Sequence, residues 1–250
     1  MTFKKTILIC LHLVLIVDLH AQSTDTRASQ DEFLSHWMAS LYSDWGIASH
    51  LFARNMTENH GFGFGGELLY NIQDDKPLWG GIGVHSFAFD DERLPYSQEI
   101  DGVYYNYEDH TASRIFMLHG IIRFQPEVRF FLQPFLQAAA GVHWYFTNTK
   151  IEDTDYDEQV ERINESRDAV LGFALHAGLQ YVPKKITDFR IDARFGYFRN
   201  ASVEYLRYNP DLNGGSFPID YFEPKVSAVD IFGIQVGITA VIRPHTELFE

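Results

Sequence analysis

Cysteine is almost absent from this chain of 250 residues. The only one, Cys10, lies in a start that has the pattern of a secretory signal peptide: a charged region over 1–5, an apolar core over 7–17, and the small residue Ala21 before a polar stretch. We expect residues 1–21 to be removed. The remaining chain has no cysteine, which excludes disulfides and thiolate metal ligands and leaves the fold to its own packing.

Long hydrophobic runs are also missing. Beyond the predicted signal peptide no stretch of 18 residues is apolar throughout, and this excludes a transmembrane helix, which needs about 20 such residues. A membrane β-barrel stays open, because its strands alternate apolar and polar residues and give a much weaker hydropathy signal.

Basic residues are scarce. The chain has 20 Lys and Arg against 34 Asp and Glu, a formal net charge of −14 at pH 7. Such a balance argues against nucleic acid as a partner. It fits a protein with strongly solvated loops, either binding an extracellular partner or bridged by divalent cations to other negative surfaces.

The sequence is rich in alternation with a period of two. Between 114 and 124, Phe116, Leu118 and Ile122 alternate with His119 and Arg123, and a similar pattern resumes after a turn. This period is typical of β-strands with one apolar face. Eight strands are predicted, at 46–56, 61–72, 78–89, 114–124, 130–146, 169–182, 189–199 and 228–243.

The connections between these strands alternate in length. Short turns are expected at 73–77, 125–129 and 183–188, and long polar loops at 90–112, 149–168 and 201–226. Short and long connections at opposite ends are typical of an up-and-down sheet. Residues 22–45 are predicted to be an N-terminal segment with a short helix within Asp31–Trp45, and 244–250 a C-terminal tail.

Two kinds of barrel fit the alternation. A lipocalin-like barrel places its apolar face inside, whereas a membrane barrel places it toward lipid. Here the second face is made of Gly, Ala, Gln, His and Arg, which suits a narrow polar lumen, and the apolar face runs for about ten residues, as a tilted crossing requires. Aromatic residues gather near both ends of that face, at Tyr70, Phe124, Phe130, Tyr181 and Phe189 and at Trp144, Phe146 and Tyr197. We therefore predict an all-β fold: an eight-stranded antiparallel up-and-down transmembrane β-barrel over 46–243.

With its signal peptide, eight amphipathic strands and alternating connections, the chain resembles the small eight-stranded outer-membrane barrels of the OmpA/OmpX type. The resemblance covers 46–243 and is architectural. It implies a porin-like cell-envelope protein in the outer membrane of a Gram-negative bacterium, with the barrel in outer-membrane lipid, the short turns in the periplasm and the long loops outside the cell.

Charged residues on the predicted lumen face are the first candidate site. We expect them to form a structural ion-paired network that closes the periplasmic half of the lumen, because a buried charge without a partner is costly. A gated ion path is the alternative. The residues are Glu67, Arg123, Arg190, Asp192, Arg194 and Arg243.

Histidines and serines on the strands raise the question of metal binding or catalysis. His119, His143 and His176 share the inward face, and His85-Ser86 and 110–113 each place a histidine near a serine. No carboxylate stands at a spacing that would complete a catalytic group. The acidic run 153–158 resembles the start of an EF-hand loop but lacks its glycine and its terminal glutamate. The sequence therefore predicts no catalytic residue, no cofactor and no metal site.

The function that these observations favour is structural, adhesive or surface-binding, carried by the long extracellular loops, and not enzymatic. A lipid-modifying outer-membrane enzyme and a secreted lipocalin-like carrier are the alternatives.

Overall fold

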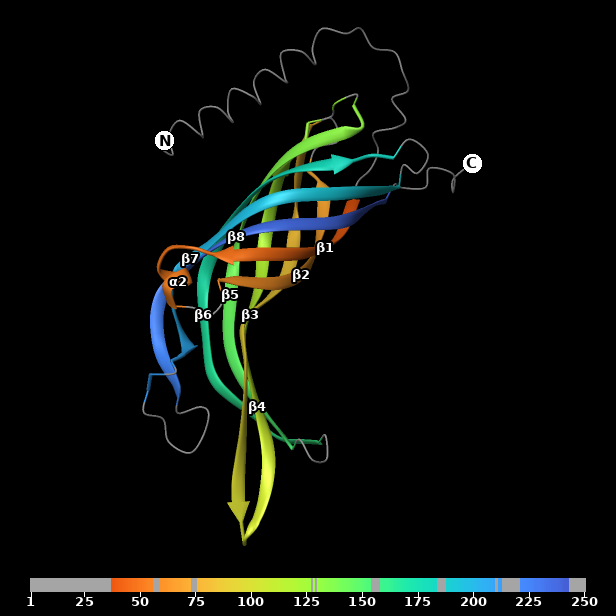
Figure 1. Ribbon diagram of the computed structural model, residues 1–250. Coiled ribbons are helices and arrows are strands. Elements are labelled where there is room, and N and C mark those ends of the chain that lie inside the picture. The colour runs from red at the N-terminus through yellow and green to blue at the C-terminus, as the bar shows by residue number, and fades with distance from the viewer. Residues whose placement is uncertain are drawn as a thin grey trace, which may run out of the picture.

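The chain folds into a closed barrel of eight antiparallel strands, each paired with its neighbours in sequence and the last with the first (Figure 1). The computed structural model describes residues 37–242 apart from 56–58, 73–75, 127, 129, 154–157, 184–187, 210 and 213–220. The strands are β1 Trp37–Ala48, β2 His60–Asn71, β3 Leu78–Ile100, β4 Val103–Phe124, β5 Leu132–Asp153, β6 Glu158–Tyr181, β7 Phe189–Tyr208 and β8 Phe222–Ile242. The predicted fold class is confirmed. The predicted signal peptide and the tail lie outside the described residues.

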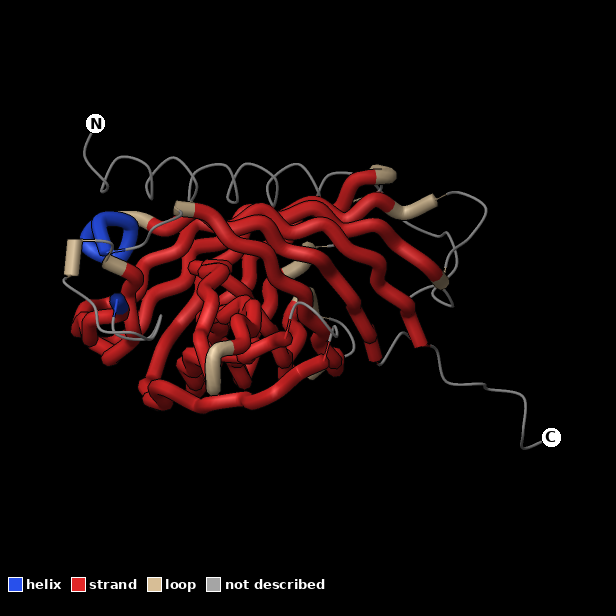
Figure 2. The backbone as a smooth tube through the Cα atoms, turned by 60° about the horizontal axis from the view of Figure 1, so that its bottom comes forward, coloured by secondary structure: helices blue, strands red, loops and turns tan. Residues whose placement is uncertain are grey.

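The first strand begins earlier than predicted. Within Asp31–Trp45 we expected a helix, but from Trp37 onward this segment is β1, and the predicted first strand at 46–56 instead contains the short helix α2, His50–Asn55 (the larger blue coil in Figure 2). The helical spacing was misleading because both faces of β1 carry apolar residues. Met38 points into the lumen, whereas Trp37 and Leu41 point outward.

The long loops predicted at 90–112, 149–168 and 201–226 do lie beyond one end of the barrel, but the prediction that they are loops is wrong. In the described residues they are mostly continuations of the barrel strands. β3 and β4 run on to a two-residue turn at Asp101-Gly102, where φ is 54° and 80°, the left-handed values of a tight hairpin. A β-bulge between Phe89 and Asp91 shifts the register of β3, so that the other set of alternate residues faces inward beyond it. Alternation is hard to see in this part because both faces are polar.

Beyond the barrel the sheet divides into two outer wings. Pairing of β2 with β3 stops at Phe62↔Ala88, and pairing of β6 with β7 stops at Gly172↔Asn200. The first outer wing consists of 91–100, 103–112, 148–153 and 158–164, from β3 to β6. The second consists of 202–208 and 222–228, from β7 and β8. Residues 91–100 alone extend about 35 Å at the usual strand rise, and this hairpin reaches the lower end of Figure 1.

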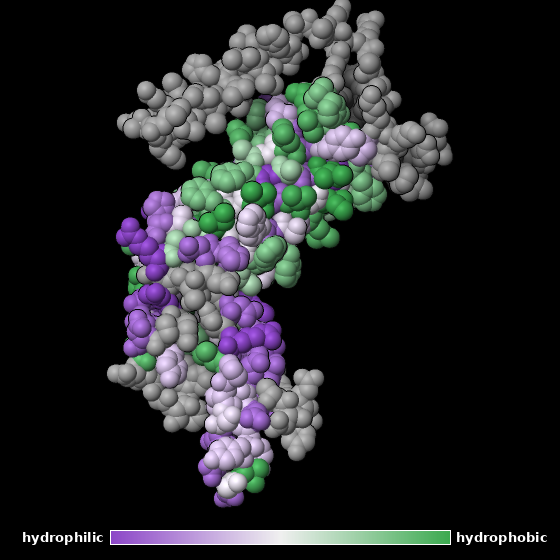
Figure 3. Space-filling view, viewed as in Figure 1, coloured by the Kyte–Doolittle hydropathy of each residue, from purple (hydrophilic) through white to green (hydrophobic). Residues whose placement is uncertain are grey.

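The outer wall of the barrel is apolar and the lumen is largely polar. Leu41 and Leu171 are each 73% exposed, and Phe195 is 53% exposed. On the face seen in Figure 3, hydrophobic residues predominate over the barrel and hydrophilic residues over the wings. A water-soluble carrier barrel has the opposite arrangement, so the apolar wall places this barrel in a bilayer.

Two exposed tryptophans on β1 mark the depth of that wall. Trp37 packs on Tyr70 near the short-turn end, with ring centroids 5.0 Å apart, and Trp45 lies eight residues further along the strand. This separation is about 27 Å along the strand. A tilt of about 40° reduces it to about 20 Å of depth, close to the apolar band of membrane barrels.

Candidate functional site

A buried ion-paired cluster fills the middle of the lumen. Glu67 of β2 accepts hydrogen bonds from Arg123 of β4 and from Arg194 of β7, whose Nη1 lies 3.1 and 3.0 Å from the two carboxylate oxygens. All three side chains are buried, with Arg123 0% exposed and the other two 5% each. One carboxylate therefore pairs with two guanidinium groups, which come from strands that are not neighbours in the barrel.

Neighbouring side chains hold the two guanidinium groups in place. Gln137 accepts a hydrogen bond from Arg123 Nε at 2.8 Å and donates one to Glu67 at 3.1 Å. The Arg123 guanidinium carbon lies 4.3 Å from the ring centroid of Phe135, and that of Arg194 lies 4.1 Å from the ring centroid of Tyr42. Stacking and hydrogen bonding of this kind suit arginine in a buried site.

The other predicted lumen charges lie nearer the short turns. Asp192, which stands between Arg190 and Arg194 in the alternation of β7, accepts hydrogen bonds from Gln180 at 2.7 Å and from Thr239. Arg190 donates to Gln180 at 2.8 Å. Within the predicted network, Glu67 is thus the carboxylate that binds Arg123 and Arg194. Arg243 lies outside the described residues.

Histidines form the next layer of the lumen, on the side of the ion-paired cluster that faces away from the short turns. His119 and His143 form a hydrogen bond between their Nε2 atoms, which lie 2.7 Å apart. His85 Nε2 lies 3.2 Å from Asp44 Oδ2, an ion-pair distance without the alignment of a hydrogen bond. His176 packs edge-on against Phe198, with ring centroids 5.1 Å apart. Within the described part of the chain, no three histidine or carboxylate side chains are placed to hold a metal ion.

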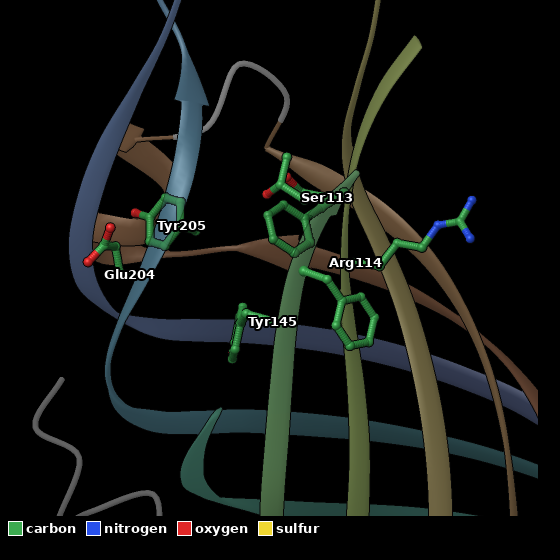
Figure 4. Close-up of a pocket in the computed structure, with 8 residues that line it drawn as sticks. Ser113, Arg114, Tyr145, Glu204 and Tyr205 are labelled. Atoms are coloured by element: carbon green, nitrogen blue, oxygen red, sulfur yellow. The ribbon is translucent and has the colours of Figure 1, made fainter. Parts of the chain in front are cut away.

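An aromatic cluster closes the outer end of the lumen. Phe52 of α2 is 1% exposed, and its ring centroid lies 5.3 Å from that of Phe89 and 5.5 Å from that of Tyr205. Figure 4 shows the adjoining cleft, which Tyr205 and Ser113 line. This cleft has no room for a water molecule. The lumen is therefore filled by side chains at two depths, by the ion-paired cluster in the middle and by the aromatic cluster at its outer end.

The residue pairs that suggested catalysis are not assembled. His85 points into the lumen and Ser86 does not, because successive strand residues face opposite sides. Ser113 exchanges a hydrogen bond with Thr147 at 2.9 Å, and His110 binds Asp91 instead. Most of the acidic run 153–158 lies outside the described residues.

Acidic residues are concentrated in the three segments whose described parts form the outer wings. The segment 90–112 has seven acidic and one basic residue, 149–168 has eight and three, and 201–226 has four and two. These three segments together carry a net charge of −13, nearly the whole of the chain's −14. The potential outside the membrane is therefore strongly negative on the wings.

Tyrosines line one face of the β3–β4 hairpin in the first outer wing. Tyr96 and Tyr107 are register partners with ring centroids 5.5 Å apart, and Tyr105 lies 6.5 Å from Tyr107. Burial and the neighbouring Asp109 carboxylate, to which its hydroxyl is hydrogen-bonded, raise the pKa of Tyr96 to about 12. Tyr104, on the opposite face, is 67% exposed.

Sequence reasoning missed several residues of these sites. Gln137 and Tyr42 complete the ion-paired cluster, and Phe52 closes the lumen from a segment predicted to be a strand. The alternation that places Gln137 on the inward face was visible, but its contact with Arg123 depends on the register between β4 and β5.

Comparisons with known proteins find likeness among solved structures alone. No family model matches the chain, and no curated protein matches it. Neisserial surface protein A is 10% identical, with 82% of this chain and 97% of that chain covered and a TM-score of 0.43. Ail, the attachment invasion locus protein of Yersinia pestis, is 11% identical, with 83% and 99% covered and a TM-score of 0.40.

A major outer membrane protein from Thermus thermophilus is 11% identical, with 82% of this chain and 99% of that chain covered and a TM-score of 0.42. At such identities and TM-scores these likenesses carry no functional argument. The strand pairing and the apolar wall are what identify the chain as an eight-stranded β-barrel of the outer-membrane type.

Proposed function

We propose that the chain is a surface-binding protein of a Gram-negative outer membrane, in which the barrel is a closed anchor and the outer wings contact a partner outside the cell. The observation that carries this proposal is the contrast between the two parts. The lumen is packed with paired charges and aromatic rings, whereas long strands project from the barrel into water.

The projecting strands have the properties of a binding element. In the described residues, β3 has no partner strand on its β2 side from Asp91 to Glu99, so its backbone groups form an open edge. Open edges can pair with a strand of another chain. Pairing within the hairpin keeps the edge extended, which limits the entropy lost on binding.

A shortened hairpin tests the proposal. Deletion of 95–100 and 103–108 joins Leu94 to Asp109 through the native Asp101-Gly102 turn, and these two residues are already register partners. The barrel is left intact, and its folding is checked by heat-modifiable gel mobility.

Intact Gram-negative cells that display either form are then mixed with beads coated with cationic, anionic or neutral polymer. We expect the full-length chain to bind at least one bead type and the shortened chain to lose that binding. Equal bead binding by both forms, or none by either, contradicts a binding role for the hairpin.

A further inference from the structure

The tyrosine face of the β3–β4 hairpin is built as a rigid contact surface. We define it as Tyr96, Tyr105 and Tyr107. Cross-strand pairing holds Tyr96 beside Tyr107, and Tyr105 follows on the same face two residues along. Tyrosine offers a large amphipathic area at low cost in side-chain entropy, which is why binding surfaces are rich in it.

The charge around this face selects the kind of partner. Arg93 is the only basic residue in 90–112, and its guanidinium lies 3.4 Å from Glu108 on the other face of the hairpin. On the tyrosine face, Asp109 is buried and hydrogen-bonded to Tyr96. Asp153 of β5, the register partner of Tyr107, is half-buried on the same face. An anionic partner is therefore repelled, while a neutral one gains nothing from the charge.

A cationic partner is attracted to such a surface by two kinds of interaction. The faces of aromatic rings attract ammonium and guanidinium groups, and the surrounding carboxylates add charge-assisted hydrogen bonds. An arginine side chain can use both, because its planar group stacks on a ring while its edge donates to a carboxylate. Within this barrel Arg194 already stacks on Tyr42 while it binds Glu67.

We infer that the tyrosine face binds an Arg- and Lys-rich segment of another protein. This inference rests on the proposed function and specifies the partner of the first outer wing. The negative field of the wings attracts the basic segment, and the tyrosine rings hold its side chains. Field and rings make separable contributions, which allows each to be tested.

The test uses the mature full-length chain in nanodiscs of zwitterionic phosphatidylcholine, with empty nanodiscs as the blank. Fluorescent nona-arginine is the probe, and nona-glutamate and a Gly/Ser nonapeptide are the comparison peptides. Fluorescence anisotropy gives the Kd of each. We expect nona-arginine to bind at least tenfold more tightly than either comparison peptide, and its Kd to rise with salt.

Three single variants separate the rings from the field. Tyr107→Ser removes a ring from the face, Tyr107→Phe keeps the ring, and Tyr104→Ser removes an exposed ring from the opposite face of the same hairpin. We expect Tyr107→Ser to raise the Kd for nona-arginine about threefold to fivefold. The other two should stay within about twofold of the unchanged chain.

Several results overturn the inference. Equal weakening by Tyr104→Ser and Tyr107→Ser means that the hairpin attracts cations through its field alone. No preference for nona-arginine means that the partner is not cationic. If the wing instead binds anionic or neutral beads in the cell assay, the proposed function stands and only the identity of its partner is wrong.

Discussion

The Glu67→Gln substitution changes the charge of the lumen cluster with little change in volume. In the folded protein, Arg123 and Arg194 then lose their shared carboxylate while both stay buried. The glutamine offers one acceptor oxygen in place of two, and its NH₂ group faces a cation. The two guanidinium groups, once bridged by the carboxylate, now repel one another.

The expected loss of stability is large. Breaking a buried ion pair by removing one partner costs about 3–5 kcal/mol. A hydrogen bond retained by the glutamine oxygen recovers about 1 kcal/mol, which leaves about 3 kcal/mol. An exposed pair costs far less, so Asp91→Asn, which removes the carboxylate partner of His110, should stay within about 0.5 kcal/mol.

Urea unfolding in lipid vesicles, followed by tryptophan fluorescence and gel mobility, measures both losses. Conductance in planar bilayers is recorded in parallel. We expect Glu67→Gln to be destabilised but non-conducting, because glutamine still fills the lumen. A loss below about 1 kcal/mol would refute the reasoning from buried charge, and a stable, conducting variant would identify the cluster as a gate.

Three further predictions concern the wall, the outer seal and the wing. Phe195→Arg on the barrel wall should cost about 2–4 kcal/mol near mid-bilayer, whereas Val226→Arg, which replaces a 67% exposed residue outside the barrel, should cost almost nothing; urea unfolding compares them. Phe52→Ala should cost about 3 kcal/mol, because it leaves a cavity among buried rings, and its urea midpoint should fall accordingly. The pKa of Tyr96 is raised to about 12, so the stability that this hydroxyl contributes is complete below the unfolded pKa near 10 and is lost as the pH rises through 12. Ultraviolet titration should show one tyrosine that ionises about two pH units later than a free one. Ionisation of Tyr96 near pH 10 would contradict this prediction.

Strand positions in the barrel were largely predictable because their pattern is local. Residues such as Leu171 and Phe195 alternate with small or polar neighbours, and the structure places both on the outer wall. The pattern failed at Trp37–Ala48, where Met38 in the lumen broke the contrast between the faces. It failed again in the outer wings, where many of the buried residues are themselves polar, such as Thr111 and Thr149, so the buried face does not stand out as apolar.

The composition of the lumen cluster was predictable, but its pairing was not. Which strand each charge belonged to, and which way it pointed, followed from alternation. Which charges meet depends on the stagger of strands far apart in the sequence. Glu67 and Arg194 are separated by 127 residues yet share two hydrogen bonds, whereas Asp192, two residues from Arg194, binds Gln180 and Thr239.

Cysteine labelling in intact cells tests most directly whether the apolar wall lies in a bilayer with the wings outside. The chain beyond Cys10 has no cysteine, so single cysteines can be placed without background. Leu41→Cys lies on the barrel wall at a position 73% exposed, and Asp101→Cys lies at the exposed tip of the β3–β4 hairpin. A membrane-impermeant maleimide should label the tip in intact cells, and should label the wall position only after boiling in detergent. Labelling of Leu41→Cys in intact cells to the same extent as Asp101→Cys would contradict the membrane barrel.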